Sequence, residues 1–588
     1  MKVALVMLAL ACWADAQTQL RSLRGVPVPE PTGLNDYVRD KAALVILGKA
    51  FFWDMQAGSD GVTACATCHF HAGADHRPRN TLVDPLNPFR VNVDLTSEMF
   101  PFRLLADPSN RDSRVLRDSG VRAGSAGTFR RIFDGIVLGQ GAELGHDELD
   151  KPEFISHGLQ VRRVTVRNTP SAFNTVYYVR NFWDGRAGRS FDGFTVTGIE
   201  AEAPGVLVTR ESTLVRERVR MDKASLAAQA VGPALDHLEM SYAGRTWPLL
   251  GKKLFNLPPL ALQRVAVDDS VLGPLARTEG RGLEDRHTYR GLMEAAFQPR
   301  LWESRQLVNG KGEPLEGRLG EPETLTEFTQ AEYNFSLIWA LALQAYQSTL
   351  NSDSSPFDRF MEGDTQALTP QQQEGMRLFD SANLRCSQCH SGAEFSGAAF
   401  NDNGTTRGDS FERTGVRPQS EDDGSGNASF KSIGLRNIEF TGPYFHNGGQ
   451  ATLEQVLDFY RRGGDFSPTV NEVRPFNLST DQAAAVVAFL KALSDDRVRY
   501  ERAPFDHPEL CVPVGHEEES PGVLLPGGLF RTSAAEKWRS VPPSGKGGNA
   551  APLRTFDEYL RGIGSSGERA HSLTEACQAP LPISVPVL

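Results

Sequence analysis

Two short segments of the chain place two cysteines and a histidine at the spacing that attaches haem covalently. The letters CATCH occupy residues 65–69, and the letters CSQCH occupy residues 386–390. In the C-x-x-C-H pattern each thiol adds to a vinyl group of the haem, and the histidine becomes the proximal ligand of its iron. The sequence therefore predicts two c-type haems and redox chemistry. The predicted attachment and ligand residues are Cys65, Cys68 and His69 in the first site and Cys386, Cys389 and His390 in the second.

A zinc knuckle and a thioredoxin-like dithiol are the alternatives for a C-x-x-C pair. Zinc requires four ligands at a site, and no second cysteine pair lies near either motif. The two thiols and the imidazole of each motif share one short turn, so each haem site can form from its own segment. The spacing therefore favours covalent haem at both sites.

The bulk composition is that of an ordinary globular chain. Its 588 residues are 40% hydrophobic and 23% charged, and such a length accommodates about two to four domains. The formal net charge of −11 argues against nucleic acid as the main partner, because phosphate binding requires a basic surface. An acidic protein can still dock a small basic redox protein.

The N-terminus resembles an export signal that is removed at a site of small residues. Lys2 supplies the positive charge, residues 3–11 are apolar, and residues 14–16 (ADA) form the expected cleavage site, which makes residues 1–16 the signal peptide. A lipoprotein signal at Cys12 is the alternative. No later run reaches the roughly 20 apolar residues of a spanning helix. We therefore expect a periplasmic protein without a membrane span, in agreement with haem attachment outside the cytoplasm.

Two of the seven cysteines remain after the signal peptide and the haem sites are subtracted. These two are Cys511 and Cys577. An oxidising compartment favours a disulfide between them, which would close a long loop in the C-terminal region. Two unrelated free thiols are the alternative.

Each haem motif is preceded by a segment with the pattern of a helix. Residues 37–54 and 370–379 both run through phenylalanine into C-x-x-C-H, which indicates an internal repeat of a cytochrome-c-like unit. A long helix over residues 328–350 is expected to join the two halves. Another is expected over residues 480–494, where Ser479 begins a capping box.

The predicted fold class is mainly α, with two cytochrome-c-like haem domains, long loops and an irregular C-terminal extension. Strand-like runs are few and are confined to residues 159–166 and 205–209. From residue 502 onward the chain is rich in proline, glycine and serine, which is typical of an irregular surface segment. The expected division is a signal peptide at 1–16, an N-terminal haem domain with insertions at 17–327, a C-terminal haem domain at 328–500 and the extension at 501–588.

Four further motifs accompany the haem sites. They are VRNTPSAFNTVYYVRNFWDGRA at 166–187, AVGPALDHLEM at 230–240, LRNIEFTGPYFHNGG at 435–449 and TLEQVLDFYRRGG at 452–464. With these motifs in this order, the chain resembles the bacterial di-haem cytochrome c peroxidase/MauG family over roughly residues 40 to 500.

The resemblance implies unlike roles for the two haems. The N-terminal haem, with His69 as proximal ligand, would be the peroxide site, and the haem of His390 would store or relay an electron. In the family a glutamate six residues after a proline assists cleavage of the O–O bond. Pro233 and Glu239 keep that offset, so Glu239 is the candidate acid/base. Without the resemblance, Glu239 would be taken for a surface helix residue.

The resemblance also implies a relay and a cation site. Trp183 matches the tryptophan that lies between the haems in the family, although a core tryptophan with a satisfied N–H is the other interpretation. Asn168, Thr441 and Pro443 match positions that bind Ca²⁺ between the domains. Amide and carbonyl oxygens suit this hard cation.

Tyr460 departs from the orthodox peroxidases of the family, in which a methionine ligates the second iron. That methionine lies fourteen residues after the histidine of the PYFH motif, and fourteen residues after His446 is Tyr460, as in MauG-type enzymes. A thioether is soft and favours Fe(II), whereas a phenolate is hard and stabilises higher oxidation states. We therefore expect Tyr460 to ligate the second iron, and a core aromatic is the alternative.

A second departure concerns the first iron. Orthodox members that require reductive activation place a histidine about seven residues before the Arg-Asn pair of the first motif. Here that position is Gln160, and His157 lies close enough in sequence to remain open as a ligand.

These features predict a periplasmic di-haem peroxidase that reduces hydrogen peroxide at the N-terminal haem and relays oxidising equivalents through the second. Its electrons would come from a redox protein or from a protein side chain that it oxidises. The alternatives are a peroxide-detoxifying cytochrome c peroxidase with a small cytochrome c or cupredoxin as donor, an oxygenase, and a non-catalytic di-haem electron carrier.

Overall fold

The computed structural model describes most of the chain outside its two ends. The expected signal peptide and Cys577 lie outside the described residues, which are 20–82, 93–148, 150–198, 203–400, 410–466, 473–516 and 536–562.

Short helices make up most of the regular structure. Their bounds are α2 (Lys41–Trp53), α3 (Ala66–His69), α4 (Ser225–Ala230), α5 (Trp247–Phe255), α6 (Tyr289–Ala296), α7 (Gln330–Tyr333), α8 (Phe335–Gln347), α9 (Pro356–Met361), α10 (Pro370–Phe379), α11 (Cys386–Cys389), α12 (Leu453–Arg461), α13 (Thr480–Lys491), α14 (Asp496–Arg499) and α15 (Phe556–Leu560).

The strands of the described residues form separate antiparallel pairs and no larger sheet. The pairs are β1 (Thr81–Leu82) with β4 (Arg122–Ala123), β2 (Arg103–Leu105) with β3 (Val115–Asp118), β5 (Arg131–Gly135) with β6 (Leu144–Asp147), β7 (Ile155–Ser156) with β8 (Leu159–Gln160), β9 (Val206–Arg210) with β10 (Thr213–Glu217), β11 (Gln306–Val308) with β12 (Pro314–Leu319), β13 (Phe411–Glu412) with β14 (Phe430–Lys431), and β15 (Leu510–His516) with β16 (Glu536–Val541).

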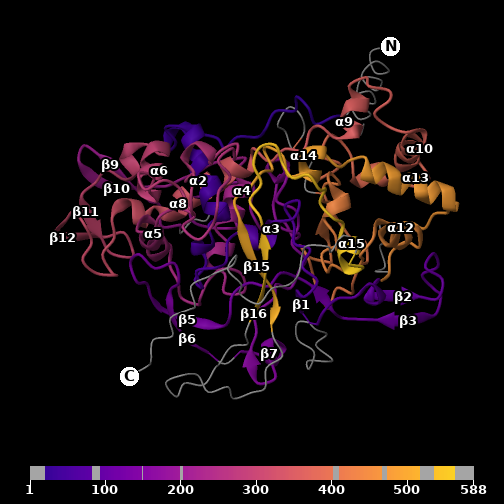
Figure 1. The fold of residues 1–588 in the computed structure, drawn as a ribbon, viewed down its shortest axis with the longest axis horizontal. Helices are drawn as coiled ribbons and strands as arrows, with labels where there is room; N and C mark the ends of the chain where they lie inside the picture. Colours follow the sequence, from indigo (N-terminus) through magenta and orange to yellow (C-terminus); the bar gives the residue numbers. More distant parts are fainter. Residues whose placement is uncertain are drawn as a thin grey trace, which may run out of the picture.

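The helices gather around two main hydrophobic cores. In Figure 1 the helices α2, α5, α6 and α8 occupy one half of the molecule, and α9, α10, α12 and α13 occupy the other. The larger core packs α2 against α8, and the smaller packs α10 against α13. The two C-x-x-C-H motifs follow α2 and α10, so each haem turn is attached to its own core.

Equivalent glycines allow these helix pairs to pack closely. A Cβ at Gly48 would lie 1.9 Å from the carbonyl oxygen of Ala342, and one at Gly375 would lie 1.9 Å from that of Ala485. Real side chains do not approach a backbone oxygen so closely, so both helices require glycine there. The same packing device in both halves matches the internal repeat expected from the sequence.

Helices begin where the sequence predicted them to begin when a capping box is present. α10 begins after Thr369 and α13 after Ser479, and both caps bond to the backbone of the third helical residue. α2 begins later than expected, at Lys41, because Asp40 accepts hydrogen bonds from the backbone of Ala42 and Ala43.

The long helix expected over residues 328–350 is interrupted at Asn334. Its side-chain amide donates to the carbonyl of Leu207 (2.7 Å) and accepts the N–H of the same residue (2.8 Å). These bonds tie the break between α7 and α8 to strand β9. α8 then lies wholly in the larger core, although the expected division assigns residues 328–350 to the C-terminal unit.

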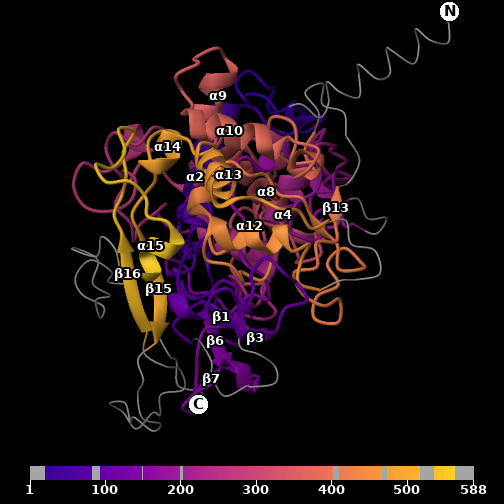
Figure 2. The same ribbon diagram turned by 90° about the vertical axis from the view of Figure 1, so that its right-hand side faces the viewer.

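The C-terminal extension contains more regular structure than expected. β15 pairs with β16 over residues 510–516 and 536–541, and α15 follows, so an irregular extension is the wrong description of this segment. Figure 2 shows these elements along one flank of the molecule. Buried Val512 and Trp538 belong to the larger core, and this long-range packing explains why local composition misled the prediction.

Two further expectations concern covalent and membrane features. Cys511 is disulfide-bonded, and its expected partner lies outside the described residues. Within the described part of the chain, no helix has the length and apolar content needed to cross a membrane.

Candidate haem sites and the loop above the first

The first haem motif presents its histidine in the form that iron requires. His69 Nδ1 donates to the carbonyl of Gly73 at 2.7 Å, which leaves Nε2 as the nitrogen that can bind a metal. Burial lowers the pKa of His69, so the imidazole is neutral. The residues therefore fit a proximal haem ligand.

The second motif is built in the same way. His390 Nδ1 faces the carbonyls of Phe395 and Ile433, each at 3.1 Å, and burial again lowers the pKa of the imidazole. Two carbonyls fix the ring and select the tautomer with a free Nε2. This site also fits an iron ligand.

Tyr460 lies on α12 in the smaller core, against the second haem motif. Burial raises the pKa of its phenol, and the thiols of Cys389 and Cys386 raise it further. Tyr460 packs against the core to which Cys386 also contributes. The residue thus lies near both attachment cysteines, as a sixth ligand of that haem requires.

Glu239 lies in the loop that faces the first motif. The Met240 sulfur is 3.9 Å from Cys65 Sγ. Burial raises the pKa of both Cys65 and Cys68, and the charge of Glu239 adds a smaller contribution in the same direction. Burial, together with the smaller effect of the Asp236 charge, raises the pKa of Glu239 itself to about 7, and Arg186 opposes both. A carboxyl with that pKa can accept and return a proton near neutral pH.

Buried contacts that were not predicted from the sequence hold this loop in place. Arg245 donates from Nη1 to the carboxylate of Glu143 (2.8 Å) and from Nη2 to the carbonyls of Ala234 and Met240. Arg245 and Glu143 are buried and form an ion pair. Pro233 opens the loop as the first residue of a short 3₁₀ turn. An isolated arginine in a polar segment carries no sequence signal for this role.

Gly127 packs directly on the backbone of the same loop. A Cβ at this position would lie 2.0 Å from the carbonyl oxygen of Leu238 and 2.7 Å from the Cα of Glu239. Any other residue must therefore displace the loop that carries Glu239.

Gly127→Ala is expected to lower the free energy of unfolding by about 1–3 kcal/mol, because the added methyl overpacks a closed contact. Displacement of Glu239 should also slow the reaction with hydrogen peroxide. Gly547→Ala is the matched control, since no atom lies within 4 Å of a Cβ there. Urea unfolding and stopped-flow mixing measure the two effects. Equal behaviour of the two variants would contradict the assigned contact.

Trp183 connects the two units of the chain. Its indole N–H donates to the carbonyl of Asn168 (2.7 Å), and its own carbonyl accepts the N–H of Lys431 (2.8 Å). The indole lies 6.3 Å from the ring of His446, which stacks on Phe430 at 3.7 Å. The position is buried and its N–H is satisfied, as in a core tryptophan, and it also places an oxidisable ring where residues of the two units meet.

The residues expected to bind Ca²⁺ are partly brought together. The side-chain amide of Asn168 lies 2.5 Å from the carbonyl oxygen of Pro443 and 3.3 Å from that of Phe445. A turn of the amide group would direct its oxygen to the same point. The Thr441 hydroxyl instead bonds the Ile438 carbonyl at 3.5 Å. No group of three or more acidic, cysteine or histidine side chains in the described residues is arranged to hold a metal ion, so a cation here would rest on amide and carbonyl oxygens.

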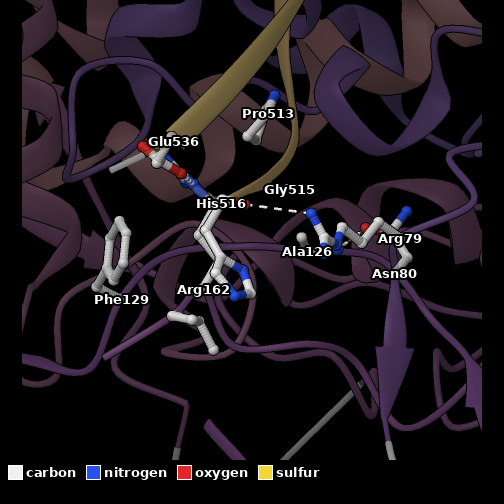
Figure 3. A pocket seen from close by; sticks show the side chains of 10 residues that line it. Arg79, Asn80, Ala126, Phe129, Arg162, Pro513, Gly515, His516 and Glu536 are labelled. Atoms are coloured by element: carbon white, nitrogen blue, oxygen red, sulfur yellow. Dashed lines mark hydrogen bonds and ion pairs between the residues drawn. The ribbon is translucent and has the colours of Figure 1, made fainter. Parts of the chain in front are cut away.

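The C-terminal hairpin closes over the first haem turn, which the sequence did not indicate. Arg77 lies 3.8 Å from Cys68 Sγ and donates to the carbonyl of Pro513 (2.8 Å). Figure 3 shows the small pocket at this junction, where Arg79 donates to the carbonyl of His516 and the side chain of Arg162 approaches β16. Arg162 forms a buried ion pair with Glu536 on that strand. The extension is thus part of the wall of the first site.

Comparison with known proteins agrees with the family resemblance noted from the sequence motifs. Residues 142–366 match the family described as di-haem cytochrome c peroxidase. Over 153 residues the chain is 36% identical to the methylamine utilization protein MauG of Methylorubrum extorquens, and over 161 residues it is 35% identical to the cytochrome c551 peroxidase of Nitrosomonas europaea. Each match covers 26% of this chain, and it covers 42% of the first relative and 44% of the second. The chain therefore spans less than half the length of these relatives.

Solved structures show weaker similarity. A MauG-like protein associated with microbial copper homeostasis aligns with 82% of this chain and 97% of its own, at 16% identity and a TM-score of 0.42. The diheme peroxidase BthA from Burkholderia thailandensis aligns with 79% of this chain and 90% of its own, at 16% identity and a TM-score of 0.39.

Proposed function

We propose, from the membership of this chain in the di-haem cytochrome c peroxidase/MauG family, that it is a periplasmic peroxidase. Hydrogen peroxide would be reduced at the haem of His69, and the haem of His390 would relay electrons. The observation that carries the proposal is the position of the loop of Glu239 against the first haem motif, where the sulfur of the adjacent Met240 lies 3.9 Å from Cys65 Sγ. Burial there raises the pKa of Glu239 to about 7.

Different residues have different roles in the proposed reduction of peroxide. Each haem would supply an iron that exchanges electrons, the first with a coordination position open to peroxide. Glu239 would accept a proton from hydrogen peroxide at the first haem and return it to the departing oxygen, so that this oxygen would leave as water. Overall, one peroxide takes up two electrons and two protons and yields two waters. The Arg245–Glu143 pair holds the acid/base in place during both transfers.

Trp183 is proposed as the relay between the units, and Tyr460 as the sixth ligand of the second haem. A buried indole at the junction shortens the distance for electron transfer. A phenolate ligand makes the second haem hard to reduce, so it can share oxidising equivalents with the first. This assignment favours MauG-like chemistry over detoxification supplied by a small cytochrome c or cupredoxin.

Stoichiometric addition of hydrogen peroxide to the diferric protein tests the proposal. Spectra of the starting protein should show one high-spin and one low-spin haem, and peroxide should oxidise both without prior reduction. Reaction of a half-reduced form only would support the orthodox peroxidase. Two six-coordinate haems that do not react would instead identify an electron carrier.

Ca²⁺ between the units is proposed on the positions of Asn168 and Pro443, and its removal gives a prediction. Chelation with EGTA should lower the melting temperature, because a cation that binds only the folded state at 100 times its Kd stabilises it by about 2.7 kcal/mol. Asn168→Ala should melt at the lower temperature and be indifferent to EGTA. If the wild-type protein melts at the same temperature with and without EGTA, the site does not hold Ca²⁺.

A further inference from the structure

A cavity between the two units touches the surroundings of both iron ligands. His69 lines it from the first haem turn, and Lys431 and Ile433 line it from the second unit. The carbonyl of Ile433 is one of the two that face His390 Nδ1. A group that enters this cavity is therefore close to both haems.

Lys431 brings a buried amino group to the cavity without an anionic partner. The residue is 5% exposed, and its ammonium lies 4.0 Å from the centre of the Tyr178 ring and 3.3 Å from the carbonyl of Arg180. Among the described residues, no carboxylate lies within 4.0 Å of it. Burial lowers the pKa of Lys431 to about 7, and only Asp184 opposes this shift.

The other buried lysines of the described chain are paired. Lys49 lies 2.8 Å from Asp269, Lys253 lies 2.6 Å from Glu143, and Lys252 lies 3.6 Å from Glu332. A buried ammonium without such a partner destabilises the folded state, because no ion pair offsets the free energy of removing its charge from water. The exception at the cavity therefore points to an anion that the protein chain does not supply.

The other charged groups around the cavity do not supply an anion for Lys431. Burial raises the pKa of Glu394 to about 8, so this carboxyl is mostly neutral at pH 7, and neither of its oxygens has a hydrogen-bond partner. Arg436 is paired with Asp358 at 2.8 Å. Lys431 is thus the cation left to bind an incoming carboxylate.

The backbone of Lys431 also belongs to the path between the units. Its N–H donates to the carbonyl of Trp183 (2.8 Å), and the N–H of Gly434 donates to the Tyr178 hydroxyl (2.7 Å). One short segment, residues 431–434, therefore connects the proposed relay tryptophan with the carbonyl that orients His390. A charge on this segment acts where electrons would pass.

We propose that Lys431 binds a propionate carboxylate of one of the two haems in this cavity and, by its charge, favours the reduced form of that haem. The inference rests on the proposed function only in requiring two haems. Carboxylates are the only anionic substituents of a haem, and a lysine binds them as a compact point charge. A positive charge beside a redox centre stabilises the added electron.

Lys431→Met tests this inference in the holoprotein by spectroelectrochemical titration without peroxide. The ratio of oxidised to reduced haem at a given potential should rise about tenfold for one haem, which corresponds to a midpoint potential about 59 mV lower. Lys431→Arg keeps the positive charge and should keep the midpoint potential close to that of the wild type. Lys252→Met, which removes a buried lysine elsewhere, is the matched control and should leave both potentials as in the wild type.

Wild-type potentials for both haems in Lys431→Met, with haem content intact, would overturn the inference. If that variant does not accumulate, Lys431→Gln is titrated in its place. The wild-type protein gives a further test, because a paired ammonium stays charged from pH 6 to 9. A step in a midpoint potential centred near pH 7 and absent from the variant would show that Lys431 has no carboxylate partner. None of these readouts requires peroxide turnover, so they remain valid if the proposed reaction fails.

Discussion

Replacing Glu239 by glutamine is expected to slow the reaction of the diferric protein with hydrogen peroxide by about 10² to 10⁴, the usual contribution of one acid/base group. Glutamine keeps the size of the side chain and removes its ability to take up a proton. The loop itself should persist, because the Arg245 bonds that hold it go to backbone carbonyls and to Glu143. Stopped-flow mixing with excess peroxide measures the rate.

The pH dependence of the wild-type rate provides a second measurement of the same group. In the proposed mechanism the first step requires the carboxylate form of Glu239, and its pKa is raised to about 7. The rate should therefore fall as the pH decreases through 7 and level off above it. The profile of the Glu239→Gln variant should lack this transition.

A surface glutamate serves as the control for the charge change. Glu316 on β12 is exposed, so Glu316→Gln should react with peroxide as the wild type does. Ferric spectra of both variants should match the wild type, which excludes loss of haem as the cause. A Glu239→Gln protein that reacts at the wild-type rate would remove Glu239 from the mechanism.

Replacing Tyr460 by phenylalanine is expected to abolish the low-spin ferric signal of the second haem. The phenol is the group that closes this coordination sphere in the proposal, and phenylalanine offers no donor atom. The midpoint potential of that haem should rise by on the order of 100 mV, since axial ligands set haem potentials over about 0.8 V. Electron paramagnetic resonance and spectroelectrochemistry provide the two readouts.

Tyr444→Phe is the matched control for this substitution. Tyr444 is a buried tyrosine of the same core, and its hydroxyl donates to the carbonyl of Ile438 at 3.0 Å. Its loss should cost about 1 kcal/mol of stability and leave both haem signals unchanged. Persistence of the low-spin signal in Tyr460→Phe would show that another residue ligates the iron.

Local sequence patterns were sufficient for the parts of the protein that form from neighbouring residues. The two C-x-x-C-H turns, the helices that precede them and the caps at Thr369 and Ser479 depend on contacts within a few residues. The candidate site residues His69 and His390 followed from the same motifs. The roles of Glu239, Trp183 and Tyr460 required the resemblance, because their types alone are compatible with ordinary surface or core positions.

Long-range packing decided what the sequence did not predict. Asn334 interrupts the expected helix through hydrogen bonds to a strand more than a hundred residues earlier, and Trp538 draws the C-terminal hairpin into the larger core. Composition had suggested an irregular surface segment there. No local pattern encodes such partners, since each contact stabilises only after the chain has closed a long loop.

The sequence by itself determined the haem-attachment chemistry expected of this protein, because covalent attachment depends on thiols and an imidazole fixed on one turn. Only the tertiary structure decided which side chains surround that chemistry: the arginine and glycine that position the loop of Glu239, the hairpin over the first motif, and the unpaired ammonium of Lys431. These features arise from burial and close approach between distant segments, and the charge state of a buried group depends on its neighbours in space.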